Sequence, residues 1–421
     1  MRTAIDIPMR LIIKIALLCS IQCKAQTDIY KGGSTSAEIS ALIARNSPLN
    51  GATIPADIGL RLGASHVAGK YFLTESPFLI AGSQAIRHLG MGTIKLWLQD
   101  RPASDYPYNS DWNLSEQANL VEIAAHPYFK AVFDMPFKTF ALSVRGEINL
   151  QQAMEASATD YAKEEEAMYQ LTKYLLQTYK DREVVFILHN WEGDWLMRGG
   201  TNAAAQWTAE SFPPDVQKRS DVMINWFSAR QTGVDRARAE MGITNCKVYH
   251  AIEVNKVLDG QKGIPCLASD VLPYVKTDMV SWSCYEGLAD PVDLWRGIDY
   301  IRENMKPTGE FPAVPIMIGE IGIPENEGAV FGIAAQDGRI IKEELIKRWD
   351  RAMSVFITQD IPYIIHWQVY CNEVKEGVKN SSVYTNDQVR GFWLIRPDGT
   401  ESYSASYLRG LIQNAGKRLG K

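Results

Sequence analysis

Glutamates end two of the strongly apolar runs in this sequence. Glu192 lies in "HNWEGDW", residues 189–195, directly behind the run "EVVFIL", and Glu320 lies in "IMIGEIG" with glycines close on both sides. Nearby glycines leave open backbone, which helps a carboxylate that must approach a substrate atom. Two facing carboxyl groups suit glycosidic bond hydrolysis, in which one protonates the leaving oxygen and the other attacks carbon or activates water. These two glutamates are therefore our candidates for a catalytic pair.

Eight strand-like apolar runs alternate with segments of helical spacing, and these elements must position the two glutamates. The runs are "IGLRLGASHV" near residue 60, "TIKLWL" from Thr93, "FKAVFDMP" from Phe129, "EVVFILHNWE" from Glu183, "CKVYHAIEVN" from Cys246, "DMVSWSCYEG" from Asp278, "PIMIGEIG" from Pro315 and "PYIIHWQVY" from Pro362. Their continuous apolar character is typical of parallel strands covered on both faces.

This order predicts an α/β protein, a single (β/α)8 TIM barrel with long loops after the strands. Helical spacing appears in "EEEAMYQLTKYLLQTYK" and again from Ile341 to Phe356, before the last run. A doubly wound sheet is the alternative, but no glycine-rich phosphate loop follows the first run. We read residues 51–415 as one catalytic barrel, residues 26–50 as a lead-in and residues 416–421 as a tail.

The first 25 residues have the pattern of a signal peptide. Arg2 and Arg10 precede the apolar stretch "LIIKIALLCSIQC", and small residues precede a cleavage point after Ala25. The stretch is short and carries Lys14, which argues against an integral membrane span. We expect an exported protein, periplasmic or extracellular. A lipoprotein is less favoured because the larger residues Leu18 and Gln22 precede the two cysteines of this segment.

Composition excludes one class of partner and leaves one redox question open. The 421 residues carry a formal net charge of -5 without a block of Lys and Arg, so we expect no nucleic-acid partner. Four cysteines follow the signal peptide and form no CxxC pair, which argues against a zinc knuckle; a single disulfide among them is possible but unassigned. These cysteines are Cys246, Cys266, Cys284 and Cys371.

Strand ends are where a barrel of this kind carries its chemistry. Strands four and seven lie on opposite sides of an eight-stranded barrel, so Glu192 and Glu320 should face each other across its mouth. Residues two apart on a strand point the same way, which would let Asn190 and Glu192 both face the mouth. Asp194 is a rival acid. We prefer Glu192 because the strand register reaches it before any glycine.

The chain resembles the clan A glycoside hydrolases, the (β/α)8 enzymes that include cellulases and mannanases. "IGEIG" is similar to the clan's nucleophile segment, which implies that Glu320 is the nucleophile, Glu192 the acid/base and the mechanism retaining. Trp367 in "IIHWQVY" resembles the aromatic floor under the reacting sugar, and Tyr285 in "SWSCYEG" resembles the aromatic residue that hydrogen-bonds the nucleophile. Members usually have Asn directly before the acid/base, but Trp191 intervenes here, so the role of Asn190 stays open.

The expected partner is a carbohydrate, which the resemblance implies to be a β-linked oligo- or polysaccharide. Tryptophans near strand ends, such as Trp97 and Trp282, suit a saccharide cleft because sugars stack on indole rings. No cofactor or metal is expected, and Glu192 should have a pKa raised toward neutrality. The predicted substrate-binding residues are Asn190, Trp191, Asp194, Trp195, His250, Glu253, Tyr285 and Trp367.

Two other functions remain open at this point. A metal-dependent TIM-barrel hydrolase would use His189, His250 and His366 as ligands, although such enzymes usually add a His-x-His pair on the first strand, which offers only His66. A carbohydrate-binding barrel without catalysis would result if Glu192 were misaligned.

Overall fold

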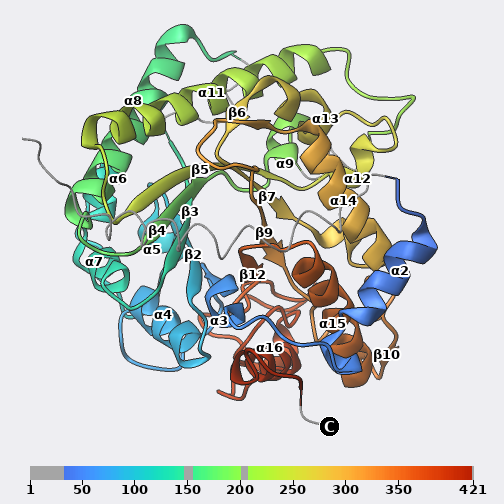
Figure 1. Ribbon diagram of the computed structural model, residues 1–421. Helices are drawn as coiled ribbons and strands as arrows, with labels where there is room; N and C mark the ends of the chain where they lie inside the picture. The colour runs from blue at the N-terminus through green and yellow to red at the C-terminus, as the bar shows by residue number, and fades with distance from the viewer. Residues whose placement is uncertain (1–32, 147–154, 201–206, 420–421) are drawn as a thin grey trace, which may run out of the picture.

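Eight parallel strands close into a barrel at the centre of the molecule (Figure 1). The computed structural model describes residues 33–146, 155–200 and 207–419, so the proposed signal peptide lies outside the described residues. In order around the barrel the strands are β1 (Leu62–His66), β2 (Thr93–Leu98), β3 (Thr139–Val144), β4 (Val185–His189), β5 (Lys247–Val254), β7 (Met279–Ser283), β9 (Ile316–Ile321) and β12 (Ile364–His366). The predicted (β/α)8 barrel is confirmed.

Helices surround this barrel, and the longest of them pack side by side outside β3 to β5. They are α2 (Ser36–Arg45), α3 (Ile58–Arg61), α4 (Phe78–His88), α5 (Pro102–Asp105), α6 (Leu120–Ala124), α7 (Pro127–Phe133), α8 (Ala158–Thr178), α9 (Gly193–Arg198), α11 (Val216–Met241), α12 (Val257–Gly260), α13 (Leu267–Asp270), α14 (Pro291–Asn304), α15 (Lys342–Thr358) and α16 (Tyr403–Gln413). Two small sheets pair β6 (Lys276–Thr277) with β8 (Lys306–Pro307), and β10 (Ala335–Gln336) with β11 (Arg339–Ile340).

The apolar core consists of two separate clusters, one inside the barrel and one between the barrel and the helices. The inner cluster is small and plugs the barrel below the site; its buried members are Ala141, Ile187, Ala251, Met279, Met317 and Ile365. The outer cluster lies between strands and helices, and includes Phe140, Phe186 and Leu188. On β4, Ile187 therefore points inward, whereas Phe186 and Leu188 point to the helices. This register decides where the residues after β4 must go.

The third predicted strand is wrong. "FKAVFDMP" forms most of α7 and the turn after it, and the strand is the next run, "TFALSV". Pro127 stands at the first helical turn and His126 caps it by accepting from the Tyr128 N–H at 3.2 Å. Phe129, Val132 and Phe133 repeat at helical spacing and are buried on one face. The aromatic and β-branched content of the run concealed this helical period.

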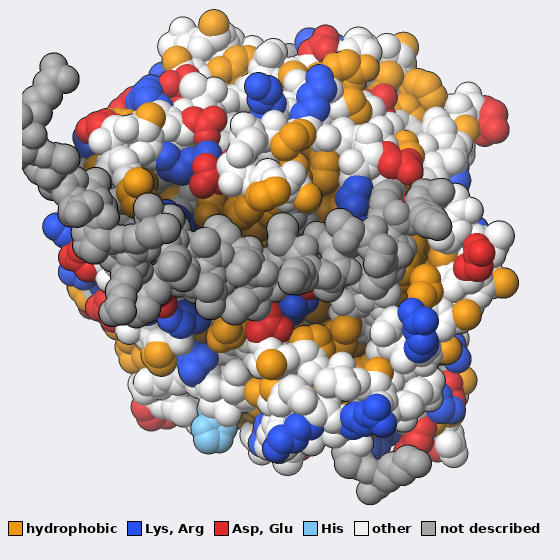
Figure 2. Space-filling model, viewed as in Figure 1, with side chains coloured by type: hydrophobic (Ala, Val, Ile, Leu, Met, Phe, Trp, Pro, Cys, Tyr) orange, Lys and Arg blue, Asp and Glu red, His pale blue; other side chains and the backbone are white. Residues whose placement is uncertain are grey.

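Other features of the chain agree with the sequence or add to it. The helical spacing predicted before β4 and β12 corresponds to α8 and α15. All four described cysteines are buried free thiols, so the possible disulfide does not form among them. Among the helices the structure describes, none combines the length and apolarity that a bilayer span requires. Acidic and basic side chains are interspersed over the visible face (Figure 2).

Candidate active site

A lysine and three glutamates meet inside the barrel near the C-terminal ends of its strands. Lys95 of β2 places its Nζ atom 2.9 Å from Glu320 Oε1 on β9 and 3.0 Å from Glu253 Oε2 on β5. The same ammonium donates to the Gly319 carbonyl at 3.2 Å. Lys95 and Glu253 are fully buried, and Glu320 is nearly so. Charges this deep are tolerated only when paired and hydrogen-bonded, which this arrangement achieves.

Glu192 reaches the site through a backbone corner. Strand β4 ends at His189, and Glu192 stands at the N-cap of α9 with φ of 27° and ψ of 70°. Because Ile187 points inward, a continued strand would turn Asn190 and Glu192 toward the helices, so the shared facing expected from the sequence is wrong. A positive φ is uncommon for a residue other than glycine, and here it redirects the side chain.

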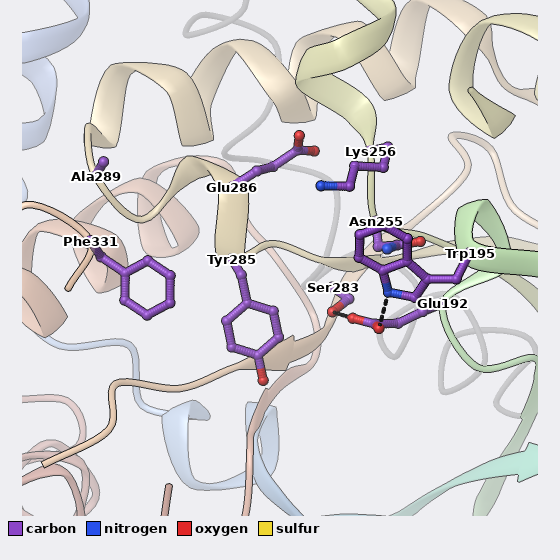
Figure 3. A pocket seen from close by; sticks show the side chains of 9 residues that line it. All are labelled: Glu192, Trp195, Asn255, Lys256, Ser283, Tyr285, Glu286, Ala289 and Phe331. Carbon is purple, nitrogen blue, oxygen red and sulfur yellow. Dashed lines mark hydrogen bonds between the residues drawn. The ribbon is translucent and has the colours of Figure 1, made fainter. Parts of the chain in front are cut away.

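Both oxygens of Glu192 are held by neighbouring donors. The Ser283 hydroxyl donates to Oε1 at 2.5 Å, and the Trp195 indole N–H donates to Oε2 at 2.6 Å (Figure 3). The Glu192 backbone N–H donates to Glu253 Oε1 at 3.2 Å. The position of this carboxyl is therefore fixed by three elements: α9, β5 and β7.

The pKa of Glu192 is raised to about 7, chiefly because the carboxyl is buried. The hydrogen bonds from Ser283 and Trp195 favour the ionised form and oppose this shift, while the nearby Glu253 carboxylate adds to it. The direction agrees with the expectation from the sequence. Trp195 acts here as a hydrogen-bond donor that lowers the pKa of Glu192.

Lys95 contacts both of the other carboxyls, but the pKa of Glu320 is raised well above its ordinary value and that of Glu253 is lowered. Burial raises the pKa of Glu320, Lys95 opposes this, and the Glu192 and Glu253 carboxyls add to the rise. Burial also works against ionisation of Glu253, but Lys95 and a 2.7 Å hydrogen bond from Ser281 outweigh it and hold the pKa of Glu253 below its usual value. The same pairing raises the pKa of Lys95 despite its burial. One cation thus contacts two of the three carboxyls in the cluster.

Asn190 and Asp194, two predicted substrate-binding residues, bind backbone instead. Asn190 Nδ2 donates to the Glu253 carbonyl at 3.0 Å, and its Oδ1 accepts from the Glu253 N–H at 2.8 Å. Asp194 is fully buried and accepts from the N–H groups of Leu267, Asn255 and Lys256 at 2.7, 2.7 and 3.0 Å. These contacts occupy both carboxylate oxygens of Asp194, which argues against Asp194 as the catalytic acid.

The histidines near strand ends do not converge. His250 points out of the barrel, where its Nδ1 lies 3.2 Å from Gln231 Oε1 on α11. It therefore does not face the mouth, and its predicted role in binding sugar is wrong. His366 stacks on Trp349 of α15, and His189 Nδ1 donates to the Asn190 carbonyl at 2.6 Å. Burial lowers the pKa of His366 to about 3 and of His189 to about 4. Within the described ranges no three His, Cys, Asp or Glu side chains are grouped to hold a metal.

A pair of tryptophans lies beside the cluster of carboxyls. Trp367, after β12, lies 5.6 Å from Trp97 between ring centroids, and its indole N–H donates to Glu373 at 3.1 Å. Lys95 Nζ lies 5.1 Å from the Trp97 ring centroid, which connects this pair to the cluster. Trp191 is 39% exposed just after β4. The mouth thus has one aromatic pair beside Glu320 and Lys95.

A pocket of about 320 Å³ opens beside Glu192. Trp195 stands on one side of it and Tyr285 with Phe331 on the other, with Asn255, Lys256 and Glu286 between them (Figure 3). Burial raises the pKa of Glu286 to about 7, and its Oε1 accepts from the Leu258 N–H at 3.1 Å. Of the predicted binding residues, Trp195 and Tyr285 line this pocket.

Sequence reasoning missed Lys95 and Ser283. Lys95 interrupts the apolar run "TIKLWL", and a lysine in a strand covered on both faces needs a buried anionic partner. That signal was available from the sequence. Ser283 carries no comparable signal, because serines are common at strand ends and its role depends on the corner that brings Glu192 toward it.

Comparisons with known proteins find only distant structural similarities. No protein-family model and no curated protein match the sequence. Similar solved structures include a glycoside hydrolase family 5 lichenase from Caldicellulosiruptor sp. F32 in complex with cellotetraose (9% identity, 94% of this chain and 99% of that chain, TM-score 0.49). Others are a Bacteroidetes-affiliated family 5 cellulase (13%, 85% and 92%, 0.47) and a broad-specificity endoglucanase from Bacteroides salanitronis (12%, 87% and 94%, 0.48). At these identities and scores, function must be argued from the site.

Proposed function

We propose that the protein is a glycoside hydrolase in which Glu192 is the acid/base and Glu320 the nucleophile. One observation carries this proposal: two carboxyls share one buried site but have different partners. Glu320 contacts the Lys95 ammonium, whereas among the described residues the Glu192 carboxyl accepts from the neutral donors Ser283 and Trp195 and contacts no cation. Contact with the Lys95 ammonium favours the ionised form of Glu320 and opposes the rise that burial and the neighbouring carboxyls produce in its pKa, whereas no such contact favours ionisation of Glu192.

The proposed reaction follows from this difference. Glu192, protonated below about pH 7, donates its proton to the glycosidic oxygen as the bond to the leaving sugar breaks. Glu320 attacks the anomeric carbon and forms a glycosyl-enzyme ester, which removes its negative charge. The pKa of Glu192 then falls, and Glu192 takes a proton from water as the water attacks the ester. The anomeric configuration is retained overall.

The substrate is proposed to be a β-linked oligo- or polysaccharide bound across the mouth. Trp367 and Trp97 offer apolar faces on the Glu320 side, and Trp195, Tyr285 and Phe331 offer them on the Glu192 side. An aromatic surface on each side of the carboxyl pair suits a sugar chain that continues in both directions from the cleaved bond.

Site-directed variants test the assignment. Parent, Glu320→Gln and Glu192→Ala proteins are compared on nitrophenyl glycosides and polysaccharides, with the exposed Glu310→Gln variant as a control for carboxyl loss. We expect Glu320→Gln to lose activity by several orders of magnitude, and azide to restore turnover to Glu192→Ala. Activity of Glu320→Gln within a few-fold of the parent would refute the nucleophile. Glycan binding without turnover by the parent would favour a non-catalytic barrel.

Export is a separate proposal that rests on the first 25 residues of the sequence. The expected mature protein begins at Gln26 and is found outside the cytoplasm, in the periplasm or the medium. N-terminal sequencing of the protein from fractionated cells tests this, and a chain that keeps Met1 in the cytoplasmic fraction would contradict it.

A further inference from the structure

The pocket beside Glu192 lies on one side of the glycosidic bond that the proposed reaction breaks. Glu192 lines this pocket, whereas Glu320 does not. In the proposed mechanism the acid/base contacts the oxygen of the leaving sugar, and the nucleophile contacts the sugar that becomes bound to the enzyme. The pocket therefore receives the leaving sugar, and the chemistry of its walls determines which sugar that is.

Asn255 offers this pocket a hydrogen-bond donor that the described residues leave unused. Its Oδ1 accepts from the Asp194 N–H at 3.1 Å, which fixes the orientation of the amide. Its Nδ2 has no hydrogen-bond partner within the described part of the chain, although the residue is only 5% exposed. A buried donor without a partner costs free energy, so an acceptor supplied by a ligand would be strongly favoured.

Lys256, the next residue, supplies a positive charge to the same pocket. Its Nζ lies 4.6 Å from the centroid of the Trp195 ring, and it forms no ion pair with an Asp or Glu of the described residues. Its backbone N–H is fixed on Asp194 at 3.0 Å, so the start of the side chain is well positioned. The ammonium is held over an indole face and remains available to an anion.

The acidic neighbours of Lys256 are already engaged. Asp194 uses both oxygens on backbone N–H groups, and Glu192 is held by Ser283 and Trp195. Glu286 accepts from the Leu258 N–H, and burial favours its neutral form although the charge of Lys256 acts against this shift. Neither Glu192 nor Glu286 forms an ion pair with Lys256, so the charge of the ammonium is not cancelled by direct contact.

We propose that this pocket is a subsite for a leaving sugar that bears an anionic group, a carboxylate or a sulfate ester, bound by the Lys256 ammonium and the Asn255 amide. The ring of that sugar lies between Trp195 on one side and the Tyr285–Phe331 pair on the other. The rings of Tyr285 and Phe331 stack with centroids 6.2 Å apart and planes at 24°. This inference rests on the proposed function, because the glycosidase mechanism identifies the pocket as the leaving-sugar side.

Direct binding tests the subsite without requiring turnover. Calorimetry on the full protein measures methyl β-D-glucuronoside, its uncharged methyl ester and methyl β-D-galactoside 6-sulfate against parent, Lys256→Gln and Lys256→Arg. Lys262→Gln, at an exposed position six residues further along, is the matched control. We expect the parent to bind at least one anionic glycoside about tenfold more tightly than the ester. Lys256→Gln should remove this preference, and Lys256→Arg and the control should keep it.

Each outcome decides the proposal. A preference for the glucuronoside identifies the group as a carboxylate, and one for the sulfated sugar identifies a sulfate ester. Equal affinities for all three sugars, no binding of any, or an anion preference that survives in Lys256→Gln would overturn it. Failure of the glycosidase proposal is recognised separately, by the absence of turnover in the parent, and full activity of Glu320→Gln refutes the nucleophile assignment. Anion binding that depends on Lys256 in a protein without turnover would leave the subsite standing and refute the mechanism.

Discussion

The Lys95 ammonium lies 2.9 Å from Glu320 Oε1 in the interior of the barrel, with neither side chain appreciably exposed. The same ammonium contacts Glu253, so a single cation compensates two carboxylates, and no cation of the described part of the chain contacts Glu192. The protonation states of the proposed catalytic pair therefore depend on one lysine that sequence reasoning passed over.

Replacing Lys95 by Met should destabilise the fold and abolish activity together. The change leaves Glu253 and Glu320 as buried carboxyls without a cation, and loss of one partner of a buried pair costs about 3 to 5 kcal/mol. Denaturant unfolding and kcat/KM measure both effects. The double variant Lys95→Met/Glu253→Gln removes one of the uncompensated charges, so it should be more stable than Lys95→Met alone. Equal unfolding free energies in Lys95→Met and the parent would contradict the ion pair.

Hydrolysis should decline as the pH rises through about 7, because the proposed acid must be protonated and its pKa is about 7. Ser283→Ala removes a donor that favours the ionised carboxyl, so it should raise this pKa and shift the alkaline limb of kcat/KM upward by about one pH unit. Trp195→Phe removes the other donor and should shift the limb the same way. Profiles that stay in place in both variants would rule Glu192 out as the titrating acid.

The raised pKa of Glu192 also predicts a pH-dependent cost to the fold. A carboxyl whose folded pKa exceeds its unfolded pKa adds most to stability below the unfolded value near 4.5, and this contribution is lost as the pH rises through about 7. Glu192→Gln cannot ionise, so it should be about 3 kcal/mol more stable than the parent at pH 9 and gain little at pH 4. Thermal or urea unfolding at the two pH values tests this. A constant difference between them would argue against the shift.

Asp194→Asn separates the two candidate acids of "HNWEGDW". Asp194 accepts from three backbone N–H groups, so we expect a loss of about 1 to 3 kcal/mol of stability with activity retained below the melting temperature. Glu192→Gln should show the reverse, a stable protein without activity. If Asp194→Asn were stable and inactive, the roles of the two residues would have to be exchanged.

Trp367 should contribute to sugar binding through its ring. Trp367→Ala is expected to reduce kcat/KM by about three- to tenfold, the usual worth of an aromatic contact. Trp367→Phe keeps a ring and loses only the N–H bonded to Glu373, so it should stay closer to the parent. Similar losses in both variants would assign the effect to the contact with Glu373 instead.

The barrel could be predicted from the sequence because parallel strands covered on both faces are rich in apolar residues, and seven of the eight predicted runs contain a strand of the barrel. The exception was "FKAVFDMP", where aromatic content outweighed the helical period of Phe129, Val132 and Phe133. Alternation of strands and helices then implied the fold even with one strand displaced along the chain.

The position of Glu192 could be predicted, but its orientation could not. Strand periodicity would turn it toward the helices, and the corner that reverses it depends on tertiary contacts with Ser283, Trp195 and Glu253. The functions of Asn190 and Asp194 were hidden for the same reason, since both bind backbone groups of segments distant in sequence.

Glu253 joins the two halves of the proposed site. Its Oε1 accepts from the Glu192 backbone N–H, and its carboxylate holds the Lys95 ammonium that contacts Glu320. Carboxyl separation is what distinguishes retaining from inverting glycosidases. The stereochemical course of hydrolysis would then depend on the length of a side chain that need not touch the sugar. Shortening Glu253 to Asp would alter the distance between the Glu192 and Glu320 carboxyls without changing either residue.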